Sequence, residues 1–272
     1  MLLVLHGPCS EVPLTHSIMT ERVPDHLFEE AHYLGRPADA DDLIIRRRVE
    51  LTRLVPGFCR KGENLLEIGC GNGASIMLLH TDFNECVGVE LFPEHEQVFT
   101  QLKAQHQANN CRFQRHNIEA EPVSGNFSRL ISFEVIEHLR TEDAVTNYFQ
   151  SLQPGGMAVF SVPNKWWIFE THGARLPLLP WNRVPFFSWL PRPLHERWAN
   201  ARIYTRRRIV KLLEKHGFVV QKTAYITAPL DVLKEGTLKR FLQRYIFRGN
   251  TTKIPFLSTS ILVTAVRPEA AR

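Results

Sequence analysis

The chain has 272 residues, of which 44% are hydrophobic and 22% charged, and its formal net charge is +5. This balance is ordinary for a globular protein and excludes a disordered chain, a collagen-like repeat and a small disulfide scaffold. No apolar run approaches the roughly 18–20 residues that a membrane-spanning helix needs, so we expect no such helix. The five cysteines lack C-x-x-C spacing, which predicts neither a zinc site nor a disulfide framework and favours a reducing cytoplasm.

Charge is distributed unevenly along the chain. Residues 1–164 carry 13 Lys and Arg against 22 Asp and Glu, whereas residues 165–250 carry 17 against 5. All five tryptophans lie between Trp166 and Trp198, inside the basic part. An acidic first half followed by a basic, Trp-rich second half predicts that the second half meets the substrate or partner.

The first half has the pattern of a parallel α/β sheet, because short β-rich apolar runs alternate with helical patterns from residue 64 onward. Before it, Asp41–Leu54 has apolar residues at helical spacing and predicts a helix packed on the cofactor side. Gln153–Gly156 predicts a turn. The predicted strands are Asn64–Ile68, Cys86–Glu90, Cys111–Arg115, Arg129–Phe133 and Met157–Val162. The predicted crossover helices are Ser75–His80, Glu94–Ala108 and Glu142–Leu152.

The second half begins with an irregular, aromatic and Pro-rich stretch over residues 165–202. It is followed by a helix with Thr205 as N-cap, a strand, a basic amphipathic helix and a last strand. These elements are predicted at Thr205–His216, Phe218–Ile226, Leu230–Phe247 and Ser258–Val266. We therefore divide the chain into a leader and cap (1–39), a nucleotide-binding core (40–164), an inserted lid (165–203) and the remainder of the α/β domain (204–272).

The strongest chemical signal is the glycine-rich turn Glu67–Gly73, which directly follows a buried strand. Its glycines allow a sharp turn and a close approach of the backbone to a ligand at the carboxyl end of the sheet. Glu90 ends the next strand, where a carboxylate is placed to hold both ribose hydroxyls of an adenosine. Gly69, Gly71 and Ala74 also fit the pattern of NAD enzymes, so an oxidoreductase stays open.

The acid inside the turn favours a different nucleotide. Glu67 would repel a pyrophosphate but attract the ammonium group of an amino acid. Here the sequence resembles the class I S-adenosylmethionine-dependent methyltransferases, and within them most closely the ubiquinone-biosynthesis O-methyltransferases. The resemblance rests on Glu67–Gly73, Glu90, Ser132–Leu139, Leu152–Gly156 and Tyr204–Phe218. It implies a Rossmann-like seven-stranded sheet, mostly parallel with an antiparallel last strand, and a lid inserted between the fifth and sixth strands.

The resemblance also implies which residues bind S-adenosylmethionine. Glu67, Gly69 and Gly71 would face its methionine part, Glu90 its ribose, and the residues after the third strand its adenine. Asn117 stands where the family usually has an acid, and its amide oxygen can accept the same hydrogen bond. The full predicted set is Glu67, Gly69, Cys70, Gly71, Glu90, Leu91, Asn117, Ile118 and Phe133.

Three side chains after the fourth strand point to the reacting end. Glu134, Glu137 and His138 have the spacing of one face at a helix start, and with His172 they could bind a divalent cation. We do not favour a metal site. Instead we predict that Glu134 orients the cofactor or the acceptor, and that His138 or His172 is the general base that takes a proton from the acceptor.

The acceptor is the least determined part of the prediction. A small aromatic, quinol-like or lipidic hydroxyl is favoured, because the tryptophans of residues 165–203 suit an apolar pocket beneath a lid. The same tryptophans and the basic helix suit peripheral contact with a membrane surface, although ordinary core aromatics and a solvated helix face explain them too. RNA is the alternative acceptor. A non-catalytic nucleotide-binding partner protein is the remaining alternative.

Overall fold

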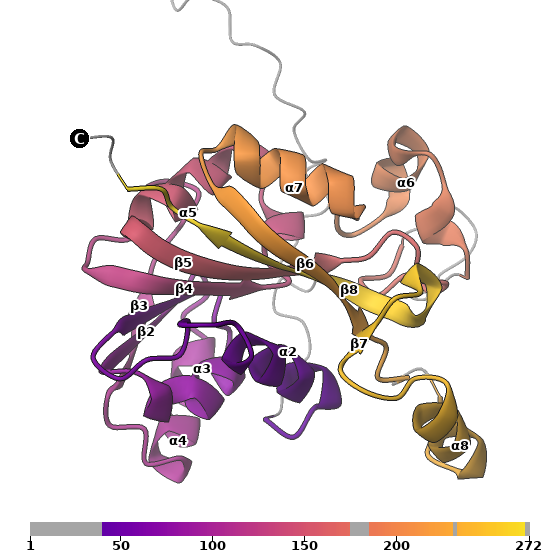
Figure 1. Cartoon of the computed structure of the whole chain (residues 1–272), viewed down its shortest axis with the longest axis horizontal. Coiled ribbons are helices and arrows are strands. Elements are labelled where there is room, and N and C mark those ends of the chain that lie inside the picture. Colours follow the sequence, from indigo (N-terminus) through magenta and orange to yellow (C-terminus); the bar gives the residue numbers. More distant parts are fainter. Residues whose placement is uncertain (1–39, 175–184, 231–232, 270–272) are drawn as a thin grey trace, which may run out of the picture.

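The computed structural model describes residues 40–174, 185–230 and 233–269. The predicted leader and cap at 1–39 therefore lies outside the described residues. The described chain forms a central sheet with helices on both sides, three of them (α2–α4) on one face and α5 and α7 on the other (Figure 1). This is the α/β architecture that the alternating pattern predicts.

The sheet has eight strands in the order β3-β2-β1-β4-β5-β8-β6-β7. Strands β1 to β5 are parallel, and β8 runs antiparallel between β5 and β6. The predicted mostly parallel sheet with an antiparallel last strand is thus confirmed. The strands are β1 Asn64–Ile68, β2 Glu85–Glu90, β3 Cys111–Arg115, β4 Phe127–Phe133, β5 Leu152–Pro163, β6 Val219–Thr227, β7 Thr251–Thr252 and β8 Ser258–Val266.

The prediction of seven strands is wrong, because the sheet has one additional short strand. The eighth strand is β7, whose two residues pair with the outer edge of β6. Two residues carry too little alternation of apolar and polar side chains to signal a strand, so only the pairing itself reveals it.

Helices lie close to where their apolar spacing predicts them. The α-helices are α2 Leu43–Arg53, α3 Ala74–Leu79, α4 His95–Gln105, α5 Val145–Ser151, α6 Arg192–Trp198, α7 Arg206–Lys215 and α8 Thr237–Tyr245. The 3-10 turns are η2 His80–Asp82, η3 Ile136–His138, η4 Glu142–Ala144, η5 Phe187–Trp189 and η6 Pro255–Leu257.

Two predicted boundaries in the second half need correction. The basic helix expected over Leu230–Phe247 is limited to α8, which follows Gly236. The stretch expected to be irregular contains α6, which begins directly after Pro191. Proline is compatible with the first turn of a helix because the backbone N–H it lacks would have no intrahelical partner there.

The turn predicted at Gln153–Gly156 lies inside β5 rather than before it. Leu152 pairs with Phe127 and Met157 with Arg129, so β5 has extra residues between two ladder positions. Gly155, at φ +76°, accommodates this irregularity. The N–H of Gly155 donates to the carbonyl of Arg267 (2.9 Å), beyond the end of β8. A glycine-rich segment that looks like a turn is therefore held in the sheet by its antiparallel neighbour.

Both faces of the sheet are buried, as expected where helices cover each side. Neighbouring strand residues divide between two hydrophobic clusters, since successive side chains point to opposite faces. Leu66 packs with Tyr148 of α5 in one cluster, whereas Leu65 packs with Ile76 of α3 and Phe99 of α4 in the other. Because both faces of such strands are buried, their sequences are nearly continuous apolar runs.

The order of strands fixes where a ligand can bind. From β1 the chain winds outward through β2 to β3, and it then returns to place β4 and β5 on the other side of β1. The crevice outside the carboxyl ends of β1 and β4 lies at this reversal, which is where open α/β sheets bind ligands.

The predicted N-cap Thr205 is confirmed, because its hydroxyl oxygen accepts a hydrogen bond from the N–H of Arg208 at 3.2 Å. We expect Thr205→Ala to lower the free energy of unfolding by about 1 kcal/mol, measured by urea denaturation, since the first turn of α7 loses its side-chain acceptor. Thr205→Ser, which keeps the hydroxyl, is the matched control. Equal stability of the Ala variant and the wild type would show that the cap contributes nothing.

Candidate cofactor and methyl-transfer site

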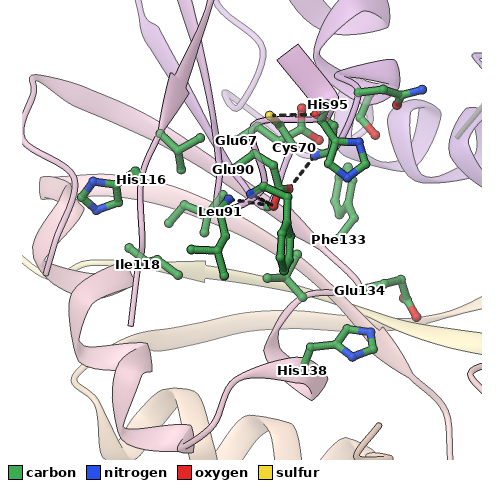
Figure 2. A pocket seen from close by; sticks show the side chains of 18 of the residues that line it. Glu67, Cys70, Glu90, Leu91, His95, His116, Ile118, Phe133, Glu134 and His138 are labelled. Atoms are coloured by element: carbon green, nitrogen blue, oxygen red, sulfur yellow. Dashed lines mark hydrogen bonds between the residues drawn. The ribbon is translucent and has the colours of Figure 1, made fainter. Parts of the chain in front are cut away.

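A pocket of about 380 Å³ opens at the carboxyl ends of β1, β2 and β4 (Figure 2). Its volume is in the range of small-molecule sites. In Figure 2, His116 and Ile118 mark one end of the pocket, and Glu134 and His138 mark the other. The pocket brings together every site residue predicted from the sequence: Glu67, Gly69, Cys70, Gly71, Glu90, Leu91, Asn117, Ile118, Phe133, Glu134, His138 and His172.

The glycine turn after β1 needs glycine for two different reasons. Gly69 has φ +71°, and a Cβ there would lie 2.3 Å from Cγ2 of Val135. Gly71 has φ +51° and no heavy atom within 4 Å of the place a Cβ would take. At Gly69, the left-handed backbone and the lack of room for a Cβ both require glycine. At Gly71, only the left-handed backbone favours it.

Glu90 ties the end of β2 to the glycine turn. Its Oε2 accepts a hydrogen bond from the N–H of Gly71 at 2.9 Å. Its Oε1 accepts from the N–H groups of Leu91 at 2.7 Å and Phe92 at 3.3 Å. A carboxylate offers about four acceptor positions, so Glu90 can still accept from a hydroxyl group of a ligand.

Glu67 is buried below the turn, with 3% of its surface exposed. Burial raises the pKa of its carboxyl group to about 8, although the N–H of Ile76 and the hydroxyl of Ser75 act in the opposite direction. Its Oε2 has no hydrogen-bond partner among the described residues. A buried acid with an unsatisfied oxygen on a pocket wall fits a ligand that carries a positive charge or a hydrogen-bond donor.

Asn117 lies at the far end of the pocket, after β3. Its Oδ1 accepts a hydrogen bond from the N–H of Glu119 at 3.0 Å. This oxygen keeps a second lone pair, so the bond does not exclude the predicted contact with adenine. The neighbouring Ile118 is buried and gives this end an apolar wall.

At the opposite end, Glu134 has a left-handed backbone with φ +58°. Its Oε1 accepts a hydrogen bond from the hydroxyl of Ser161 at 2.8 Å and pairs with Arg48 of α2 at 3.0 Å. The expectation that Glu134 shares a helix face with the residues that follow is wrong, because η3 is a single 3-10 turn that begins after it. Such backbone conformations in non-glycine residues cluster at functional sites.

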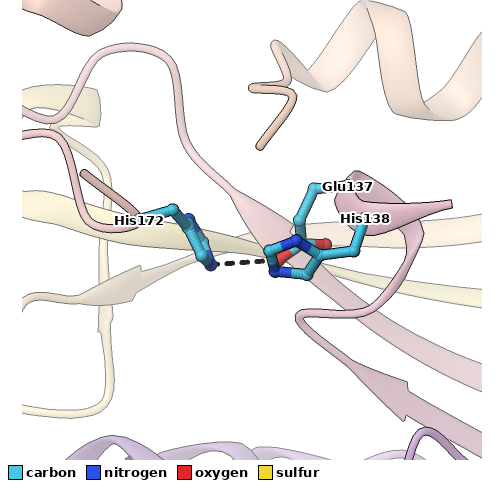
Figure 3. A group of neighbouring side chains, drawn as sticks. All are labelled: Glu137, His138 and His172. Carbon is cyan, nitrogen blue, oxygen red and sulfur yellow. Dashed lines mark ion pairs between the residues drawn. The ribbon is translucent and has the colours of Figure 1, made fainter. Parts of the chain in front are cut away.

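The side chains of Glu137, His138 and His172 meet beside Glu134 (Figure 3). Their nearest oxygen and nitrogen atoms all lie within 4.8 Å of one another. His172 Nε2 is 3.5 Å from Glu137 Oε1, and the two imidazole rings are 5.0 Å apart. Burial, and then the nearby charge of Glu134, raise the pKa of Glu137 well above its ordinary value. The two predicted bases therefore share a site with a buried acid.

The loop that carries His172 is fixed by a buried hydrogen-bonded pair of side chains inside the predicted lid. Glu170 Oε1 accepts a hydrogen bond from the N–H of His172 at 3.2 Å. Glu170 Oε2 lies 2.8 Å from Nε2 of His195 in α6, and both side chains are buried. The side-chain amide of Asn200 donates to the carbonyl of His172 at 3.0 Å. Glu170 and Asn200 of the lid thus hold the backbone N–H and the backbone carbonyl of His172.

The tryptophans have a different place from the one we expected. Among the described residues of the lid, His172 alone lines the pocket. Trp167 is only 4% exposed and packs with Leu230 and Phe247 in a separate small core. Trp181 lies outside the described residues. The described part of the lid therefore positions His172, a candidate catalytic residue, and contributes no other residue to the pocket lining.

Sequence reasoning missed several residues of the pocket. Arg48 lies on the helix predicted to pack on the cofactor side, but nothing in the sequence indicated its pairing with Glu134. His116 directly follows β3, and the rule that ligands bind at strand ends could have found it. The other lining residues not predicted are Ile45, Ile68, Asn72, Ala74, Ser75, Val89, Phe92, His95, Glu119, Val135 and Leu139.

The profile of the methyltransferase-domain family matches residues 42–223, more than half of the chain. The chain belongs to this family, and it is a class I S-adenosylmethionine-dependent methyltransferase. No curated protein sequence matches it. Within the described residues, no helix is both long and apolar enough to cross a membrane.

Solved structures of methyltransferases share the fold. An S-adenosylmethionine-dependent methyltransferase from Mesorhizobium loti is 16% identical with a TM-score of 0.56, over 84% of this chain and 100% of that one. The N-methyltransferase NodS from Bradyrhizobium japonicum, in complex with S-adenosyl-L-homocysteine, is 14% identical with a TM-score of 0.51, over 84% and 90%. The magnesium protoporphyrin IX methyltransferase ChlM from Synechocystis, with bound cofactor, is 14% identical with a TM-score of 0.50, over 84% and 80%.

The raised pKa of Glu67, about 8, predicts that cofactor binding releases a proton. Below that pKa the carboxyl group is protonated in the ligand-free protein, whereas an ammonium group favours the carboxylate. The affinity for S-adenosylhomocysteine should therefore rise as the pH increases from about 6 to about 8, by at most about tenfold per pH unit, and then level off. Calorimetry in buffers of different ionisation enthalpy measures the proton directly.

The matched control for this prediction is Glu67→Gln, which keeps the shape of the side chain and cannot ionise. It should bind S-adenosylhomocysteine more weakly and without the rise in affinity over this pH range. The free energy of unfolding of the ligand-free wild type should fall over the same range, because Glu67 binds a proton more tightly when folded. Wild-type affinity that is independent of pH would contradict the assignment.

Proposed function

We propose that this protein methylates a hydroxyl group of a small, apolar, aromatic or quinol-like acceptor. The single observation that supports this proposal most is the continuity of the pocket. One cavity joins the glycine turn and Glu90 at one end to the imidazoles of His138 and His172 at the other, and the buried acid Glu137 lies close to both imidazoles. A methyl donor and a proton acceptor would thus face the same space.

The cofactor end follows from the contacts of the chain itself. Bound S-adenosylmethionine supplies an electrophilic methyl group on a sulfonium. We assign Glu67 to its ammonium group, Glu90 to its ribose hydroxyls, and Asn117 and Ile118 to its adenine. The unsatisfied oxygen of Glu67 and the spare acceptor capacity of Glu90 support this orientation.

At the transfer end, we assign proton removal to the imidazoles. The acceptor oxygen forms a bond to the methyl carbon, the carbon–sulfur bond breaks, and its electron pair stays on sulfur. The hydroxyl proton passes to a ring nitrogen of His172 or His138, a transfer that typically contributes about 100-fold or more. Arg48 and Ser161 hold the Glu134 carboxylate in place beside them. Much of the remaining rate enhancement comes from holding the acceptor oxygen in line with the methyl carbon and the sulfur.

The lining of the transfer end supports an apolar acceptor. Ile45, Phe133, Val135 and Leu139 contribute to the same pocket as the imidazoles. We also propose that the protein acts in the cytoplasm at the periphery of a membrane, where such acceptors partition. The four cysteines among the described residues are free thiols, which supports a reducing compartment.

Methyl transfer from labelled S-adenosylmethionine distinguishes the possible acceptors. We expect label in catechol or a prenylated phenol and none in total RNA, because the pocket has the volume of a small-molecule site and apolar side chains contribute to its lining. Label in RNA alone would replace the proposed acceptor by nucleic acid. Binding of S-adenosylhomocysteine without label in any fraction would favour a non-catalytic nucleotide-binding protein.

His172→Asn tests the proton acceptor. We expect turnover of the labelled phenol to fall by about 100-fold while the affinity for S-adenosylhomocysteine changes less than about threefold, because His172 lies at the opposite end from the adenine-binding residues. His106→Asn, outside the pocket at the end of α4, is the matched control and should keep full turnover. An unchanged rate in His172→Asn would remove this residue from the mechanism.

The same assay separates a base from a metal site. Glu137, His138 and His172 are groups that could also hold a divalent cation. Because we assign the imidazoles to proton transfer, we expect treatment with EDTA to leave turnover unchanged. Loss of turnover that Mg²⁺ or Mn²⁺ restores would replace the base assignment by a metal bound to these three residues.

A further inference from the structure

Helix α8 presents an apolar face to solvent. Leu238 is 65% exposed, Phe241 54% and Tyr245 59%, and Ile246 follows directly after the helix and is also exposed. The spacing of three and four residues places Leu238, Phe241 and Tyr245 on one side of the helix. The rings of Phe241 and Tyr245 lie 4.8 Å apart. Figure 1 shows α8 at the margin of the molecule, away from the layers that cover the sheet.

Side chains bordering this apolar face hold α8 in its orientation. Leu242, one turn after Leu238, packs against the small core that contains Trp167, Leu230 and Phe247. Arg47 of α2 donates hydrogen bonds to the carbonyls of Phe247 at 3.1 Å and Thr227 at 2.5 Å. These contacts anchor α8 to the rest of the protein. The outer apolar face takes no part in this packing.

A second exposed apolar group lies next to this core. The rings of Phe186 and Trp189 are 5.0 Å apart, and those of Trp189 and Phe256 are 5.4 Å apart. These three side chains and Ile254 are exposed. Phe256 immediately precedes Leu257, which packs on the core beneath α8. The two exposed apolar groups therefore flank one shared core.

The charge on and next to α8 is mostly positive. Residues 236–258 contain no Asp or Glu, and they contain five cations: Lys239, Arg240, Arg244, Arg248 and Lys253. Lys239 pairs with Glu235, just before the helix, at 2.5 Å. Apolar side chains flanked by arginines match a surface with negative charge outside and hydrocarbon below.

We propose that the outer face of α8, together with Phe186, Trp189, Ile254 and Phe256, is a docking surface for an anionic lipid bilayer. Aliphatic side chains such as Leu238 have no π-face on which a nucleic acid base could stack. They gain free energy by leaving water for the acyl region of a bilayer, while the arginines contact the headgroups. This proposal deepens the proposed function by naming the surface, but its binding step can be measured without methyl transfer.

A series of contacts connects the docking surface to the transfer end of the pocket. Trp167 in the shared core contacts Phe169 at a ring distance of 5.9 Å and Phe247 at 6.2 Å. Phe169 precedes Glu170, whose carboxylate holds the backbone of His172. An acceptor dissolved in the bilayer would therefore have a short path to the imidazoles. We infer that the natural acceptor is amphiphilic, with an apolar part that remains in the lipid.

Co-sedimentation of the full chain with lipid vesicles tests the docking surface. We expect binding to phosphatidylcholine vesicles with about 30% phosphatidylglycerol, much weaker binding to phosphatidylcholine alone, and a loss of binding in high salt. The double variant Leu238→Ser with Phe241→Ser should lower the partition coefficient by about tenfold or more. Its melting temperature and its affinity for S-adenosylhomocysteine should stay unchanged, because both side chains are outside the packed core.

The matched control is Leu54→Ser, which removes a comparably exposed leucine (73%) at the end of α2. It should bind vesicles like the wild type. A wild type that does not bind anionic vesicles, or an equal loss in the Leu54 variant, would overturn the proposal. So would a wild-type dimer that the double variant converts to a monomer, since the face would then dock a second copy. Competition of total RNA with vesicles would assign the surface to nucleic acid.

The two proposals fail separately. Vesicle binding with no methyl transfer to any hydroxyl acceptor would count against the proposed function alone. Methyl transfer to a phenol in a protein that does not bind vesicles would count against the docking surface alone. Arg240→Glu with Arg244→Glu provides a second variant, and it should lose the preference for anionic over neutral vesicles while keeping the apolar face.

Discussion

The carboxylate of Glu90 connects the parts on which the rest of the site depends. It ends β2, yet its oxygens accept hydrogen bonds from the backbone of Gly71 in the preceding turn and from the two residues that follow it. This contact closes the glycine turn against the neighbouring strand at the point where the strand order reverses. The Glu90 side chain thereby fixes the backbone of the glycine turn, which lines the pocket at the carboxyl ends of the strands.

Two buried acids stand at different places in and behind the same pocket. Glu67 lies under the glycine turn and Glu137 behind the imidazoles, and burial is the main reason that both have raised pKa values. Burial disfavours the charged form of a carboxyl group, so Glu67, with a pKa of about 8, is mostly protonated near neutral pH in the ligand-free protein. In the function proposed above, Glu67 meets the ammonium group of the cofactor at one end of the pocket, and the imidazoles take the acceptor proton at the other.

The second half of the chain supports the pocket more than it encloses it. In the described residues, the Glu170–His195 pair and Asn200 hold the peptide of His172, while Trp167 forms a small core with Phe247. That core carries α8, whose outer face remains apolar and surrounded by arginines. Part of the positive charge seen in the sequence, Arg240, Arg244 and Arg248, lies on or directly after this helix.

The sequence by itself determined the order of the strands and helices apart from α6 and β7, and it indicated the residues of the candidate cofactor site. Apolar periodicity, the glycines after β1 and the acid at the end of β2 are local signals, because backbone stereochemistry acts over a few residues. The tertiary structure alone decided the rest. It paired Arg48 with Glu134, brought His172 to Glu137, buried Trp167 and left one face of α8 exposed. Each of these depends on packing between segments distant in the chain, and burial also sets the protonation of Glu67, which no local pattern encodes.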